Sequence, residues 1–140
     1  MKSVVMEVDA SGNFVGSSYM YATARDWAKF GLFCLNNGNW NGVQILPTNW
    51  IEYVTTPTIN SPNGNYGAQF WLNAGHKSDH SDRPMPDLPA DLFYCSGYEG
   101  QFVIIVPSLD LVVVRLGLYT SRSALNKEEF FKSIITPFMS

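Results

Sequence analysis

The sequence predicts an α+β fold in which an antiparallel sheet carries a C-terminal helix on one of its faces. Three runs of strand-forming residues, at 92–97, 101–106 and 111–117, follow one another with only short turns between them, as antiparallel strands do. A final helix is expected after Asn126, where a capping sequence precedes apolar residues at helical spacing. The 140 residues, 46% of them hydrophobic, suit one globular domain or a piece of a larger one.

The N-terminal part predicts short strands joined by tight turns. Strands are expected at 3–8 and 13–15, around a turn at 9–12. Asn41 and Gly42 form a dipeptide that favours a two-residue hairpin turn, because both residues tolerate positive φ.

Two helices are expected before residue 57. Thr23 and Asp26 form a capping-box-like start, in which side chains satisfy free N–H groups of the first turn. This helix has only a narrow polar stripe, so we expect most of it to be buried. Asn37 and Gly38 end it, since glycine adopts positive φ easily. A second, shorter helix is expected from Pro47.

The middle of the chain is richer in loops. Residues 57–65 form a turn-rich stretch, and 66–72 alternate well enough to predict a strand. Residues 73–91 are the longest polar stretch. A loop of this length inside a domain is usually functional or mobile.

The central strands require cover on both faces of the sheet. Residues 101–106 and 111–114 are apolar on both sides, which is typical of a strand buried between two layers. One cover is the final helix, which gathers its apolar residues on one side (Phe130, Phe131, Ile134, Ile135 and Phe138). The second cover is not evident from the sequence pattern.

Composition argues against several classes of function. The net charge is -3 and the chain has no basic run, so nucleic-acid binding, which needs clustered Lys and Arg, is not expected. No apolar stretch is long enough to span a bilayer. The first residues do not read as a signal peptide, because Glu7 and Asp9 interrupt a short apolar run.

Two cysteines and a pair of histidines are the candidate reactive groups outside the nucleophile motifs. Cys34 and Cys95 are interpreted as two buried free thiols; the alternative is a nucleophilic Cys95, which has no histidine near it in sequence. His76 and His80 have the spacing of metal ligands on one helix face. Their stretch contains a glycine and two prolines and no apolar period, so a solvated loop is favoured, and neither a metal nor a cofactor is expected.

No nucleophile motif is present, and one glycine-flanked turn stands out. The sequence has neither Gly-x-Ser-x-Gly nor Ser-x-x-Lys. Gly97 and Gly100 flank Tyr98 and Glu99 at the start of an apolar strand. Two readings stay open. The glycines allow a ligand or another backbone to approach closely, or they form a bulge or tight turn in which Tyr98 packs.

Three segments together resemble a known family: ATARDWAKFGLFCLNNGNWNGVQILPTNW, YGAQFWLN and LPADLFYCSGYEGQFVIIVPSLDLVVVRLG. They are similar to the C-terminal part of the serine β-lactamase-like family, which includes class C β-lactamases, penicillin-binding proteins, esterases and a linear-oligoamide hydrolase. The resemblance covers roughly 16–117 and implies helical segments on the second face of the sheet. It implies that 1–140 is the C-terminal segment of a single β-lactamase-like domain, whose N-terminal helix and first two strands lie upstream.

The resemblance also implies a site. Of the three catalytic motifs of the family, only the Lys/His-x-Gly motif of the pocket wall has a counterpart, Tyr98-Glu99-Gly100, which would bind substrate. The backbone N–H of Gln101 would donate to the oxyanion hole, a type of contact worth about 3 kcal/mol in the transition state. Gly100 would leave a bare strand edge for the substrate.

Departures from the family pattern shape the expected function. Tyr98 stands where β-lactamases have a cationic Lys, and the Glu99 carboxylate would repel the carboxylate of a penicillin. An esterase, amidase or peptidase-like relative is therefore expected, acting on a small-molecule or peptide substrate. Without the serine motif the chain by itself is expected to be inactive.

An alternative without catalysis stays open. A remnant of the family could bind a peptide or cell-wall fragment. It could also form a homodimer through an exposed sheet face. Members of the family are often exported, so the resemblance implies a periplasmic or other extracytoplasmic location.

Overall fold

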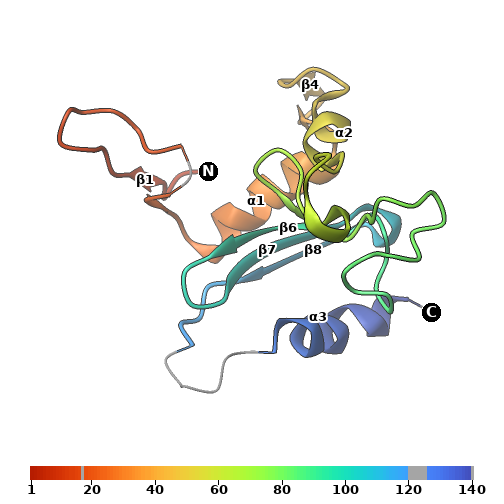
Figure 1. Cartoon of the computed structure of the whole chain (residues 1–140). Helices are drawn as coiled ribbons and strands as arrows, with labels where there is room; N and C mark the ends of the chain where they lie inside the picture. The colour runs from red at the N-terminus through yellow and green to blue at the C-terminus, as the bar shows by residue number, and fades with distance from the viewer. Residues whose placement is uncertain (17, 120–125, 140) are drawn as a thin grey trace.

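The computed structural model describes residues 1–16, 18–119 and 126–139. It has three layers, with a sheet between helices. The helices are α1 (Ala24–Leu35), α2 (Trp50–Thr55) and α3 (Lys127–Ile135). The strands are β1 (Val5–Met6), β2 (Met20–Tyr21), β3 (Asn39–Trp40), β4 (Val43–Gln44), β5 (Trp71–Leu72), β6 (Phe93–Gly97), β7 (Gln101–Val106) and β8 (Leu111–Arg115). An antiparallel sheet in the order β5-β6-β7-β8 lies between α1 and α3 (Figure 1). The predicted α+β class is confirmed.

The β6–β7–β8 meander matches the predicted strands closely. Tyr94 pairs with Ile104, and Ile104 pairs with Val113, so both ladders are antiparallel and in continuous register. The five residues that follow Gln101 in β7 are all buried, because β7 has a strand on each side and a helix on each face. Asp110 closes the second turn in the left-handed conformation, with φ 47.

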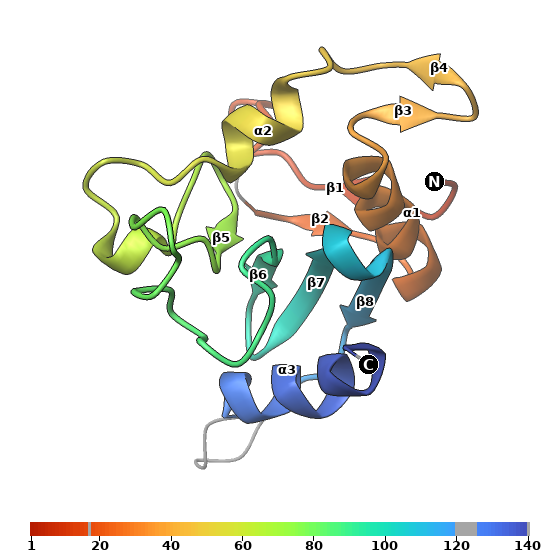
Figure 2. The same ribbon diagram turned by 90° about the vertical axis from the view of Figure 1, so that its right-hand side faces the viewer.

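The second cover of the sheet is α1, packed over β7 and β8, as Figure 2 shows. Gly31 makes this close approach possible, since a Cβ at that position would lie 2.5 Å from Val112 Cγ1. The sequence pattern failed to identify this cover. The expectation that most of α1 is buried is also wrong: its inward stripe is buried, but Leu32 is exposed, and Trp27 and Phe30 are only partly buried.

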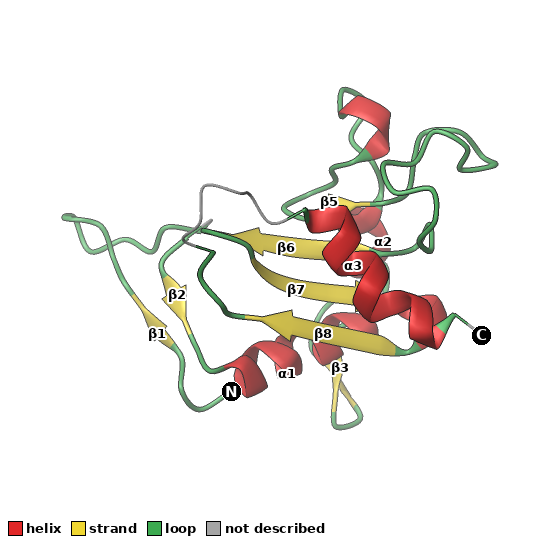
Figure 3. Ribbon diagram, turned by 90° about the horizontal axis from the view of Figure 1, so that it is seen from below, coloured by secondary structure: helices red, strands yellow, loops and turns green. Residues whose placement is uncertain are grey.

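The other cover is α3, which lies across the strands when seen from below (Figure 3). Asn126 caps it as predicted, because its side chain accepts a hydrogen bond from Glu129 N. Phe131 and Ile135 are fully buried against the sheet. Phe138, which was expected on the same apolar side, is exposed because the helix gives way to a 3-10 turn at 136–138.

The predicted strand at 66–72 is largely a turn. Gly67 N donates to Phe70 O, and Gln69 has a φ of 70, so the chain reverses before Trp71. Only Trp71 and Leu72 pair with β6. Alternation of apolar and polar residues predicted a strand here, but the local turn bonds dominate.

Hydrogen bonds between residues of the 73–91 loop hold it in a defined conformation. The Asn73 side chain is fully buried and donates to backbone carbonyls of the loop (Met85, Leu88 and Pro89). Met85 and Leu88 are themselves buried in the core under α3. The stretch is a loop as predicted, but these two side chains anchor it to the sheet.

The N-terminal strands pair differently from the prediction. The predicted turn at 9–12 is present, since Gly12 N donates to Asp9 O and Asp9 N donates to Asn13 O, and an antiparallel bridge joins Val8 to Phe14 around it. The ladder of β1, however, is made with β2.

Half of the predicted capping box of α1 is present. The Thr23 side chain accepts from Asp26 N, whereas the Asp26 carboxylate accepts from Lys2 N and Ser3 N and not from the N–H groups of the first turn of the helix. In the described part of the chain, no helix has the length and apolar character needed to cross a membrane.

Candidate functional site

The candidate site residues form the turn between β6 and β7, seen at the left end of that hairpin in Figure 1. Gly97 pairs with Gln101, so the loop proper is Tyr98, Glu99 and Gly100. Glu99 has a φ of 50 and Gly100 a φ of 79, and a non-glycine residue at positive φ is uncommon outside special turns. The structure therefore supports the turn reading. Gly100 does not leave a bare strand edge, as the resemblance implied, because it lies in the turn between β6 and β7 and not along a strand.

Two groups from the β8 side hold this turn. Arg115 Nη1 donates to Gly100 O at 2.5 Å and to Gly117 O at 2.7 Å. Tyr119 N donates to Glu99 O at 3.1 Å. The Arg115 guanidinium also lies 5.7 Å from the centre of the Phe130 ring, which stabilises its position. Sequence reasoning missed both residues; a single cation ending an apolar strand was the only available signal.

These contacts fix the direction of the backbone groups in the turn. Glu99 O and Gly100 O both point to the β8 side, and in a trans peptide the N–H points opposite to its C=O. The N–H groups of Gly100 and Gln101 therefore point away from β8, and that of Gln101 points toward β6, where Gly97 is its pairing partner. The Gln101 side chain donates to Tyr98 O at 3.2 Å.

Tyr98 is the most accessible side chain of the turn, 77% exposed. A hydrogen bond with the Glu99 carboxylate, together with its negative charge, raises the pKa of the Tyr98 hydroxyl. Tyr98 is therefore neutral at physiological pH and acts as a hydrogen-bonding group with an aromatic face. The turn as a whole carries the single negative charge of Glu99.

Both cysteines are free thiols, as predicted; Cys34 is buried, but Cys95 is only partly buried, and neither is activated. Burial raises the pKa of the Cys95 thiol to about 11. Burial, with a smaller contribution from Cys95, raises that of Cys34 to about 12. Both thiols stay protonated at neutral pH, which argues against a nucleophilic Cys95 because the thiolate is the reactive form.

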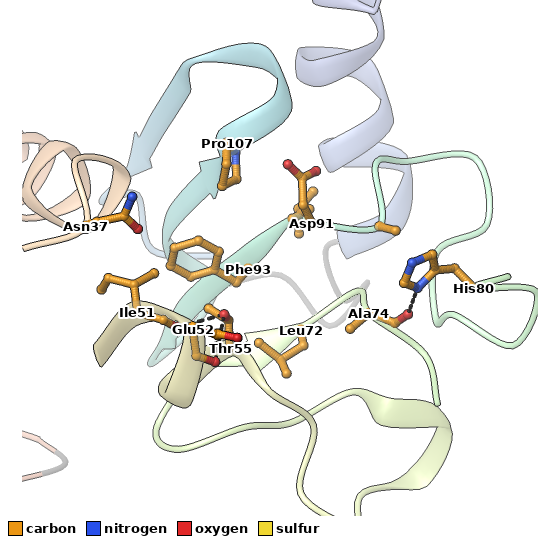
Figure 4. A pocket seen from close by; sticks show the side chains of 12 residues that line it. Asn37, Ile51, Glu52, Thr55, Leu72, Ala74, His80, Asp91, Phe93 and Pro107 are labelled. Carbon is orange, nitrogen blue, oxygen red and sulfur yellow. Dashed lines mark hydrogen bonds between the residues drawn. The ribbon is translucent and has the colours of Figure 1, made fainter. Parts of the chain in front are cut away.

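Both histidines contact backbone carbonyl oxygens, one within the 73–91 loop (Figure 4) and one in the 57–65 stretch. His76 Nε2 lies 2.7 Å from Ser61 O, and His80 Nδ1 lies 2.5 Å from Ala74 O. The Asp82 carboxylate accepts from the N–H groups of His76 and Lys77. Within residues 1–16, 18–119 and 126–139, no three His, Cys, Asp or Glu side chains converge as metal ligands would.

The chain is similar to known proteins both in sequence and in structure. No family model matches the sequence. An uncharacterized protein of Alkalihalophilus pseudofirmus is 35% identical over an alignment that covers 69% of this chain and 29% of the relative. A solved structure from Bacillus anthracis, provisionally described as a 6-aminohexanoate-dimer hydrolase, superposes with a TM-score of 0.61 and 26% identity. That superposition covers 94% of this chain and 31% of the other, so this chain spans about a third of the length of these relatives.

The structural likeness extends over nearly the whole chain. The three-layer arrangement of α1, the sheet and α3 is therefore shared with a protein described as a hydrolase. A likeness of fold does not by itself assign a reaction, because chemistry depends on the residues of the site.

Proposed function

We propose that residues 1–140 form part of a single domain of a hydrolase of the serine β-lactamase-like family, in which the 98–100 turn lines the substrate cleft. The observation that carries the proposal is the superposition of 94% of the chain on a protein described as a hydrolase of 6-aminohexanoate dimer. That compound is a linear amide, and a linear-oligoamide hydrolase belongs to the family that the sequence resembles.

The turn would contribute substrate contacts and an oxyanion donor. Tyr98 offers an exposed ring and hydroxyl, and Gly100 offers backbone that a substrate can approach without meeting a Cβ. The backbone N–H of Gln101 is the proposed oxyanion donor. To act in this way it must leave its pairing with Gly97, or share its hydrogen bond, when substrate binds.

The charge of the turn favours a particular substrate class. A neutral Tyr98 and an anionic Glu99 offer no cation to the carboxylate of a β-lactam, and Glu99 repels it. Neutral esters and neutral amides avoid this repulsion. In a linear amide such as 6-aminohexanoate dimer, the carboxylate stands at the far end of the chain from the scissile bond, so it need not lie beside Glu99. Linear amide or ester bonds are therefore the proposed targets.

The nucleophile would come from outside these residues. Catalysis by acyl transfer needs an activated serine with its base, and oxyanion donors alone retain little activity. Because no Ser-x-x-Lys occurs in the 140 residues, we propose that the serine, its lysine and the catalytic tyrosine are supplied by a further segment. Residues 1–140 alone would then be inactive.

A substrate comparison tests this proposal. The natural protein that contains residues 1–140 should hydrolyse p-nitrophenyl esters or 6-aminohexanoate dimer. It should act on the β-lactam nitrocefin much more slowly. Nitrocefin turnover at rates typical of β-lactamases would refute the proposed substrate class. Absence of all three activities would refute the proposed hydrolase function.

A non-catalytic role is the second candidate, and one observation favours it. The outer edge of β8 has no strand partner in the described part of the sheet, and its five residues are all only partly buried. An unprotected edge invites strand addition from a peptide or a second copy. Light scattering should then detect dimers of the 140-residue chain, and a monomer at high concentration would contradict this role.

A further inference from the structure

One basic side chain, Arg115, is held by three separate parts of the chain. It is the last residue of β8 and pairs with Phe102 of β7. Its Nη1 donates to Gly100 O in the β6–β7 turn and to Gly117 O beyond the end of β8. Its guanidinium lies over the Phe130 ring of α3. Each of these contacts restricts the side chain, so its charge has a defined position beside the turn.

The backbone at Gly117 leaves room for this guanidinium. A Cβ at Gly117 would lie 3.3 Å from Arg115 Nη2 and 3.4 Å from Arg115 Cζ, closer than such atoms usually approach. Gly117 does not have a positive φ, so its backbone conformation does not call for glycine. The missing side chain at this position is therefore explained by the guanidinium that covers it.

Aromatic packing positions the ring beneath the guanidinium. Phe130 lies nearly parallel to Phe102, with ring centres 6.3 Å apart and an angle of 26° between the rings. Phe102 is buried in β7 and directly follows Gln101. Because Phe130 packs on Phe102 and also supports Arg115, the docking of α3 on the sheet helps to fix the turn.

The contact with Arg115 acts on the peptide that carries the proposed oxyanion donor. Gly100 C=O and Gln101 N–H belong to one planar peptide unit, so a bond to the oxygen fixes the direction of the N–H. The bond is charge-assisted, and a cation at the oxygen polarises the peptide and strengthens its N–H as a donor. With its oxygen held, the peptide keeps its orientation when the N–H leaves Gly97 for a substrate oxygen.

We propose that Arg115 is a positioning residue for hydrolysis, which orients and polarises the Gly100–Gln101 peptide without touching the substrate. This inference rests on the proposed function, since it assigns a role in the same site. Two hydrogen bonds, the stacked Phe130 ring and the room left at Gly117 carry it. A residue that only joined β8 to the turn would affect stability, and it would leave the turnover of each folded molecule unchanged.

The test is the hydrolysis of a p-nitrophenyl ester by the natural protein that contains residues 1–140. Arg115→Met should lower kcat about 10- to 100-fold, as misplacement of a catalytic group does, with KM within about twofold, because the donor acts mainly in the transition state. Arg115→Lys keeps a cation that can donate and should give a kcat between those of R115M and the wild type. Arg25→Met removes an exposed arginine of α1, which lies outside the turn and its contacts, and should change neither constant.

Each outcome decides the proposal once kcat is expressed per active site, counted by complete labelling with a fluorophosphonate. An unchanged kcat in R115M, an effect on KM alone, or a kcat in R115K no higher than in R115M would overturn it. Should R115M fail to fold, R115K decides: a lowered kcat at unchanged KM supports the proposal, and a wild-type kcat overturns it. A wild-type natural protein without esterase or amidase activity would refute the hydrolase itself, whereas an active wild type with an equally active R115M would refute this inference alone.

Discussion

Asn73 and Met85 exchange two hydrogen bonds across the loop between them. Asn73 Oδ1 accepts from Met85 N at 2.7 Å, and Asn73 Nδ2 donates to Met85 O at 2.9 Å. The Asn73 amide thus bonds both backbone groups of Met85, as a residue of a neighbouring strand would. These bonds hold the long polar loop in place beside β6.

Removal of this amide should destabilise the chain. Asn73→Ala leaves Met85 N and Leu88 O without a partner among the described residues, and each unpaired buried group costs about 1–3 kcal/mol. We expect a loss of about 3 kcal/mol or more in the free energy of unfolding, measured by urea denaturation. Asn60→Ala, at an exposed position, should change it by less than about 0.5 kcal/mol, and equal effects of the two substitutions would contradict this role of Asn73.

The contact between α1 and β8 depends on the absence of a side chain at Gly31. Gly31→Ala would gain up to about 1 kcal/mol of helix propensity, but its Cβ would collide with Val112. We expect a net loss of about 1–2 kcal/mol by chemical denaturation. Gly16→Ala, where nothing lies within 4 Å of the new Cβ, is the control; stabilisation by Gly31→Ala would show that α1 does not pack this closely.

Lys127 and Tyr94 connect α3 to the sheet. Lys127 Nζ donates to the Tyr94 hydroxyl at 2.6 Å and lies 5.1 Å from the centre of its ring. Tyr94→Phe removes the hydrogen bond and should cost about 1–2 kcal/mol of stability. In a double-mutant cycle with Lys127→Met, we expect a coupling energy of about 1 kcal/mol; additive effects would mean that the two groups do not interact.

Asp26 should make stability depend on acid pH. Its side chain is buried and accepts hydrogen bonds from Lys29, Ser3 and the N–H of Lys2, which lower the pKa of its carboxyl below 3.8. Its stabilising effect is therefore complete above the pKa of the unfolded chain and is lost as the pH falls toward the folded-state value. Asp26→Asn should lower the melting temperature at pH 7 and less so at pH 3. A difference that stays constant between these pH values would contradict the linkage.

The strands and helix caps were predictable because their signals are local. Runs of β-branched residues define β7 and β8, and Asn126 is recognisable as a cap from its neighbours alone. The pairing of β1 with β2 was not predictable, since it joins residues far apart in sequence. The cover by α1 was missed for a similar reason: an apolar stripe does not reveal which surface it meets.

The candidate site was predictable only in part. Two glycines around Tyr98 drew attention to the right segment, and their spacing left a turn and a ligand contact equally open. The structure supports the turn but reveals contacts that no spacing rule contains. Arg115 and Tyr119 reach Gly100 and Glu99 only because β8 returns beside β7.

The most direct test of the central proposal is covalent labelling of the natural protein that contains these residues with a fluorophosphonate, followed by mass spectrometry of its peptides. The account predicts one modified serine, located in a Ser-x-x-Lys motif outside residues 1–140, and no label on the 140-residue chain alone. No modified serine in the natural protein, or modification of a serine within residues 1–140, would contradict it.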